Sequence, residues 1–150
     1  MSIFFSTAKK QLSKLPLMQL DALIAREPLQ ELLTPLDQLA SARQGGPEPF
    51  EPQSMASTLL LAIWYDLGFM HLERALRVRL DFMLFCQFEP MSPTPSASSI
   101  CRFKKRLESL ALYDAFIDEV DRQLVAQGVK IKLPPGALLD LKLKMRKPLN

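Results

Sequence analysis

The chain has 150 residues, of which 48% are hydrophobic, and this is enough to build one hydrophobic core. Its net charge of +3 and its pI near 9.0 favour an anionic partner only slightly. The longest apolar run, residues 59–65, is too short to cross a membrane, so we expect a cytoplasmic protein. The two cysteines, Cys86 and Cys101, and the single histidine, His71, are not spaced as the ligands of a zinc site are.

Residues 1–49 are expected to form an N-terminal segment and a linker. Apolar residues between positions 17 and 24 have helical spacing, and prolines interrupt the stretch that follows. This pattern predicts a loosely structured front, residues 1–44, with short helices. The Gly-Gly-Pro-Glu-Pro sequence at residues 45–49 predicts an exposed linker.

Residues 50–128 are expected to form a helical domain. The stretch 53–67 is apolar on nearly all sides, which is typical of a helix at the centre of a bundle, and Gly68 could end it in the left-handed conformation. Residues 71–88 predict two short helices or one bent helix. The three prolines within residues 89–95 predict a rigid connector.

The next predicted helix, residues 97–110, carries a basic cluster. Ser96 can cap its start, and Ile100, Phe103 and Leu107 form an apolar stripe. The cluster itself contains Arg102, Lys104, Lys105 and Arg106. These cations could neutralise phosphates from the second helix of a helix-turn-helix, or they could simply form a solvated helix face.

The last predicted helix, residues 111–127, exposes several acidic residues and ends at Gly128. Residues 129–133 alternate apolar and basic side chains, as an edge strand does. The lysine- and arginine-rich residues 142–147 could either add phosphate contacts or form a frayed, solvated end. The expected fold class is therefore mainly α, a helical bundle followed by a short β segment.

Asp140 is the one candidate catalytic residue. It follows the apolar residues 137–139, which predict a buried strand, and a carboxylate at such a position can bind Mg²⁺. Because no acidic residue follows Asp140, the chain lacks the further carboxylates that a magnesium-dependent nuclease site needs.

Four stretches of the chain together resemble a known family. They are residues 50–67, residues 72–85, residues 95–104 with an Arg-Phe pair and a further basic residue, and residues 124–128 followed by residues 136–140. In this order and spacing they resemble the N-terminal part of bacterial transposases of the insertion-sequence-five type, which have an Asp-Asp-Glu catalytic triad. Ser96 departs from the family pattern, which usually has an aspartate there, and so do the residues that follow Asp140.

The resemblance implies that residues 50–128 bind the terminal inverted repeats of a mobile element. It also implies that residues 129–150 begin a ribonuclease-H-like catalytic domain, with Asp140 as its first catalytic and metal-binding carboxylate. The complete enzyme would use Mg²⁺ for its reaction. This chain is then expected to be a truncated transposase that binds DNA. The alternatives are an interaction module or a split-enzyme subunit that associates with an intact transposase or with itself.

We predict that the purified 150-residue chain does not cleave DNA in the presence of Mg²⁺, because one carboxylate cannot hold the two metal ions of the family reaction. Incubation with supercoiled plasmid and Mg²⁺, followed by gel analysis, tests this. Plasmid nicking that depends on Mg²⁺ and disappears in the Asp140→Asn variant would contradict the prediction.

Overall fold

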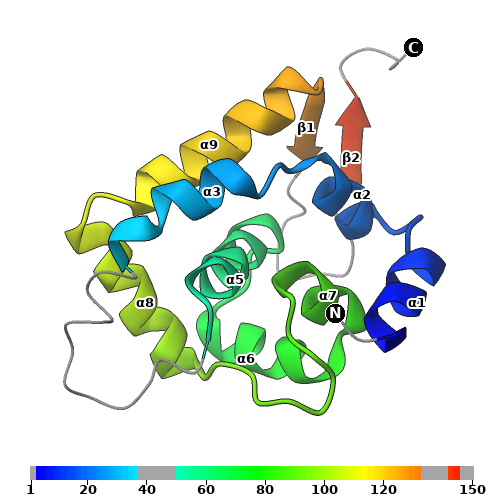
Figure 1. Cartoon of the computed structure of the whole chain (residues 1–150), viewed down its shortest axis with the longest axis horizontal. Coiled ribbons are helices and arrows are strands. Elements are labelled where there is room, and N and C mark those ends of the chain that lie inside the picture. Colours follow the sequence, from blue (N-terminus) through cyan, green and yellow to red (C-terminus); the bar gives the residue numbers. More distant parts are fainter. Residues whose placement is uncertain (1–2, 37–49, 133–141, 146–150) are drawn as a thin grey trace.

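A computed structural model describes residues 3–36, 50–132 and 142–145 of the chain. The described part is mainly helical, as the sequence predicts (Figure 1). The helices are α1 (Ile3–Gln11), α2 (Pro16–Leu23), α3 (Glu27–Leu32), α5 (Pro52–Trp64), α6 (Phe69–Val78), α7 (Leu80–Cys86), α8 (Ala97–Ser109) and α9 (Tyr113–Ala126). Two short strands follow, β1 (Val129–Lys132) and β2 (Lys142–Met145).

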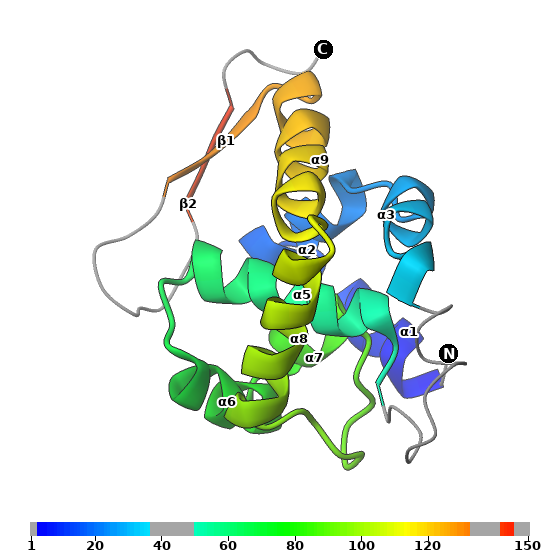
Figure 2. The same ribbon diagram turned by 90° about the vertical axis from the view of Figure 1, so that its left-hand side faces the viewer.

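Helix α5 lies at the centre of the bundle (Figures 1 and 2). Its residues are buried almost without interruption from Ser54 to Leu61, and Trp64 is buried as well. Helices α6, α7 and α8 all pack against it. The central position predicted from its all-round apolar sequence is therefore confirmed.

The end of α5 differs from the expectation at Gly68. Asp66 has the left-handed conformation (φ 52°), the Leu67 N–H donates to the Ala62 carbonyl at 3.0 Å, and the Asp66 N–H donates to the Ile63 carbonyl at 3.3 Å. This is a Schellman ending, and aspartate tolerates its left-handed position better than most residues. Gly68 has an ordinary φ of −68° and is the N-cap residue of α6 instead.

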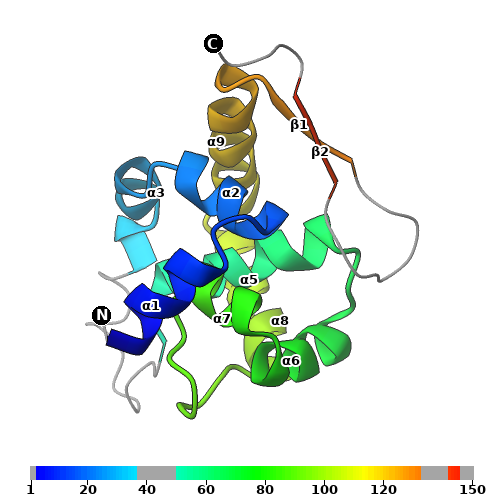
Figure 3. The same ribbon diagram turned by 90° about the vertical axis from the view of Figure 1, so that its right-hand side faces the viewer.

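The short helices expected in the front segment are confirmed for residues 3–36, but the segment is not loosely structured, and that part of the expectation is wrong. Leu17, Leu20 and Leu29 are fully buried, α2 packs against α7, and α3 packs against α9. Figure 3 shows α1, α2 and α3 along one side of the bundle. The boundary predicted between residues 49 and 50 adjoins residues 37–49, which lie outside the described part.

Two polar side chains hold the front segment in place. The Arg26 guanidinium pairs with Asp21 and donates to the Ser57 hydroxyl of α5 at 3.1 Å. It also donates to the Phe85 carbonyl of α7 at 3.3 Å and stacks over the Phe85 ring. The Gln123 side chain of α9 accepts from the Ala25 N–H at 2.7 Å and donates to the Ala25 carbonyl at 3.2 Å. The front segment is thus bonded to α5, α7 and α9.

Helix α8 begins where the sequence predicts. The Ser96 hydroxyl accepts a hydrogen bond from the Ser99 N–H at 3.1 Å, which satisfies one of the free donors of the first turn. The Glu73 carboxylate of α6 accepts from the Ala97 N–H at 2.7 Å. The start of α8 is therefore held by its own cap residue, Ser96, and by Glu73 of the neighbouring helix α6.

The strands pair in an antiparallel ribbon with Val129 opposite Met145 and Lys132 opposite Lys142. Helix α9 separates the ribbon from α3, as Figures 2 and 3 both show. The strand expected at residues 129–133 is confirmed as β1, and Gly128 precedes it in the left-handed conformation. The frayed end that was one alternative for residues 142–147 is wrong for residues 142–145, which form β2. The predicted strand at residues 137–139 lies outside the described part.

We predict that Gln123→Leu lowers the free energy of unfolding by about 1–2 kcal/mol, because both backbone groups of Ala25 lose their side-chain partners. Urea unfolding monitored by circular dichroism measures this loss. The matched control is Gln19→Leu, the same substitution at an exposed position of α2, which should change stability far less. Equal effects of the two substitutions would show that the bonds to Ala25 contribute nothing.

We further predict that Ser96→Ala destabilises the protein by about 1 kcal/mol, because the Ser99 N–H then lacks its cap. Ser98→Ala, at an exposed position in the same turn, is the control and should be nearly neutral. Thermal unfolding of the two variants side by side gives the comparison. A Ser98 effect as large as that of Ser96 would contradict the capping role.

Candidate nucleic-acid interface

Helix α8 lies on the surface of the molecule and presents a polar face to solvent. In Figure 2 it runs through the front of the view, with α6 beside its lower end. Ile100, Phe103 and Leu107 are buried, whereas Arg102 and Lys105 are exposed. The apolar stripe predicted for this helix is therefore confirmed.

The four predicted DNA-binding cations do not share one surface. The Lys104 ammonium lies 5.2 Å from the centre of the Tyr113 ring and is half-buried against α9. Arg106 is also half-buried. At about 100° per residue, positions 104 and 106 lie on opposite flanks of the helix. Of the predicted set, Arg102 and Lys105 are the exposed members.

Helix α6 packs against α8 and carries two further exposed arginines, which were not among the cations predicted from the sequence. Arg74 and Arg77 are exposed on α6, opposite the buried Leu72 and Leu76. Their helical spacing from these leucines could have indicated an exposed position. What the sequence could not indicate is that α6 packs against α8, which follows only from the tertiary structure.

The helix-turn-helix predicted around α8 remains a prediction. Residues 87–96 separate α7 from α8, whereas such a motif has a tight turn of about three or four residues. The helices packed on α8 are α5, α6 and α9. If α8 enters a DNA groove, the helix beside its first turn is α6.

Helix α9 limits the basic surface. Asp114, Asp118 and Asp121 are exposed on it, and burial together with the nearby Asp118 carboxylate raises the pKa of Asp121 above its ordinary value. Its Arg122 is paired with Glu119, and this hydrogen bond lowers the pKa of the Glu119 carboxyl. An acidic surface repels phosphates, so α9 is a poor candidate for contact with nucleic acid.

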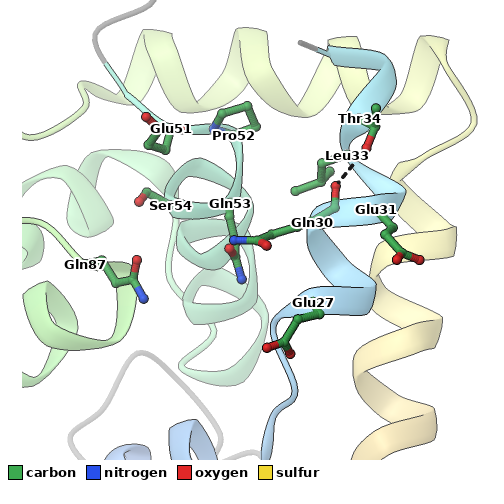
Figure 4. Close-up of a pocket in the computed structure, with 10 residues that line it drawn as sticks. All are labelled: Glu27, Gln30, Glu31, Leu33, Thr34, Glu51, Pro52, Gln53, Ser54 and Gln87. Carbon is green, nitrogen blue, oxygen red and sulfur yellow. Dashed lines mark hydrogen bonds between the residues drawn. The ribbon is translucent and has the colours of Figure 1, made fainter.

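A pocket of about 610 Å³ lies between α3 and the start of α5 (Figure 4). Three carboxylates, Glu27, Glu31 and Glu51, line it together with the amides of Gln30 and Gln53, and no lysine or arginine is among its lining residues. The Gln53 side-chain nitrogen is buried without a hydrogen-bond partner among the described residues. A pocket of this charge does not suit phosphate, so it is a poor candidate for contact with nucleic acid.

The described residues contain no group of three His, Cys, Asp or Glu side chains that could hold a metal ion. Asp140, the predicted catalytic and metal-binding residue, lies outside the described residues. Of the helices that the structure describes, none is long and apolar enough to cross a membrane alone. Helices α5 and α6 taken together have the length and composition of a membrane-spanning segment, but the chain bends by 112° between them.

Comparison with curated proteins and with solved structures gives no significant match. The family model "Transposase domain (DUF772)" matches residues 5–106. This range begins in α1, includes the packed front segment and ends within the basic cluster of α8. Since the match covers about two thirds of the chain, the protein belongs to the DUF772 transposase domain family.

Proposed function

We propose that this chain is a DNA-binding N-terminal region of a transposase of the insertion-sequence-five type, and that α8 contacts the DNA. The observation that carries the proposal is the pair of exposed cations, Arg102 and Lys105, on the outer face of a capped surface helix within the family-matched range. Terminal inverted repeats are the expected target, as the family resemblance implies.

The binding would be driven mainly by phosphate contacts. Arginine presents a planar fork of N–H donors that matches two phosphate oxygens, and lysine adds a point charge. Each neutralised phosphate releases condensed counterions, so the affinity should fall steeply as salt rises. The buried stripe of α8 and its caps at Ser96 and Glu73 would hold the two cations in place during contact.

The proposal assigns binding, and not strand cleavage, to this chain. In the complete enzyme three carboxylates would hold magnesium ions. The described residues offer no such group, and Asp140 lies outside them. The cation requirement, the ribonuclease-H-like domain and a cytoplasmic location remain predictions from the sequence.

An interaction module that binds an intact transposase or a second copy of the chain is the alternative. Its natural contact surface would be the strongly apolar helix α5. However, Leu59, Leu60, Leu61 and Trp64 are buried within the bundle and are not available to a partner. The structure therefore supports this alternative less well than DNA binding.

We predict that Arg102→Ala and Lys105→Ala each weaken binding to duplex DNA and reduce the slope of log affinity against log salt by about one. Fluorescence anisotropy with a labelled duplex at several salt concentrations measures both effects. The matched control is Arg122→Ala, which removes an exposed arginine from the acidic helix α9 and should leave the slope unchanged. Salt-independent binding, or equal slopes for all three variants, would contradict the proposal.

Cys101 provides a second readout of the same contact. It is partly exposed on α8, whereas Cys86 is fully buried and its pKa is raised by burial, so a thiol reagent should label Cys101 first. DNA bound to α8 should slow this labelling in the wild type and less in Arg102→Ala. Labelling at the same rate with and without saturating DNA would place the contact elsewhere.

A further inference from the structure

We propose that α6 forms the second half of the DNA-binding surface, with Arg74 and Arg77 contacting backbone phosphates beside those bound by Arg102 and Lys105. This inference rests on the proposed function, because it assumes that α8 faces DNA. It adds two residues outside the basic cluster and makes the interface a surface of two helices. We call Arg74, Arg77, Arg102 and Lys105 together the two-helix basic surface.

The contacts at the start of α8 join the two helices into one surface. One Glu73 carboxylate oxygen accepts from the Ala97 N–H at 2.7 Å, and the other lies 3.4 Å from an Arg77 guanidinium nitrogen. From the α8 side, an Arg102 nitrogen lies 3.4 Å from the Ser99 hydroxyl, which lies 3.1 Å from the Ser96 hydroxyl. The guanidinium groups of Arg77 and Arg102 are therefore both positioned beside the first turn of α8.

Arg77 keeps most of its hydrogen-bonding capacity for a ligand. Its side chain is 60% exposed, and a guanidinium has five N–H donors, of which the contact with Glu73 uses one at the long distance of 3.4 Å. Exposed ion pairs of this kind contribute little to stability. A phosphate could therefore bind Arg77 without first disrupting an essential contact of the fold.

Glu73 determines how the phosphate would approach. Its carboxylate already accepts the N–H of Ala97, so the end of α8 that usually attracts anions is occupied by a negative charge of the protein itself. Phosphates would be bound by the arginine side chains around this end and not by the backbone N–H groups. The exposed acidic residues of α9, the helix that follows α8, would disfavour DNA beyond the C-terminal end of α8.

The first test compares Arg74→Ala/Arg77→Ala with the wild type and with Arg122→Ala, using two unrelated duplexes of roughly 30 base pairs, enough to cover a single-domain site. The double variant should reduce the salt slope by about two and weaken binding to both duplexes by the same factor, as loss of backbone contacts does. An unchanged slope, or one no lower than that of Arg122→Ala, would overturn the inference. Unfolding temperatures confirm that each variant is folded, and Arg74→Gln/Arg77→Gln serves if the alanine variant is not.

The second test uses a substitution that should strengthen DNA binding instead of weakening it. Glu73→Gln keeps an oxygen acceptor for the Ala97 N–H but removes the negative charge beside Arg77. It should bind both duplexes several-fold more tightly at low salt, at a nearly unchanged melting temperature, if phosphates lie beside residue 73. Equal or weaker binding by folded Glu73→Gln would contradict the inference.

The two proposals fail in different ways. If wild-type protein does not bind duplex DNA, both the proposed function and the two-helix basic surface are wrong. If Arg102→Ala and Lys105→Ala weaken binding while the α6 double variant and Glu73→Gln behave like the wild type, only the role of α6 is wrong.

Discussion

The need to bury α5 on nearly every side determines how the other helices are arranged. A helix that is apolar around its whole circumference cannot lie at a surface without exposing a large hydrophobic area to water. Helices α6, α7 and α8 cover part of it, and the front segment completes the core. Arg26 reinforces this closure, since it bonds to the Ser57 hydroxyl of α5 and the Phe85 carbonyl of α7 while paired with Asp21. The transposase-domain match likewise includes these front residues.

Three helices end in the same way, and these endings set the directions of the helices around α5. Asp66, Gln87 and Ala111 have the left-handed conformation at the ends of α5, α7 and α8, each followed by an N–H that bonds back into the last turn. A left-handed non-glycine residue costs about 1 kcal/mol, so the surrounding packing must select this conformation. The turn at Ala111 directs α9 away from α8, so the exposed acidic residues and the exposed cations Arg102 and Lys105 lie on different helices.

Charge on the surface follows helix geometry and not adjacency in the sequence. The run from Arg102 to Arg106 looks like one cluster in the sequence, yet 100° per residue spreads its members around the helix. Lys104 lies over the Tyr113 ring, and Arg102 and Lys105 remain at the exposed face. Packing of α6 against α8 then adds arginines from a separate part of the chain. The proposed nucleic-acid surface would therefore depend on the packing of two helices, which a search for basic runs in the sequence cannot find.

The sequence by itself determined the elements whose signals are local: the apolar period of α5 and α8, the serine cap at Ser96, the prolines of the connector and the left-handed Gly128. These features depend on neighbours within about one helical turn, so the residues concerned are sufficient to specify them. Only the tertiary structure decided that residues 3–36 belong to the core, that Asp66 rather than Gly68 ends α5, and that Glu73 joins α6 to the first turn of α8. These outcomes depend on contacts between distant residues, such as Ala25 with Gln123, and local preferences do not encode which distant surfaces meet.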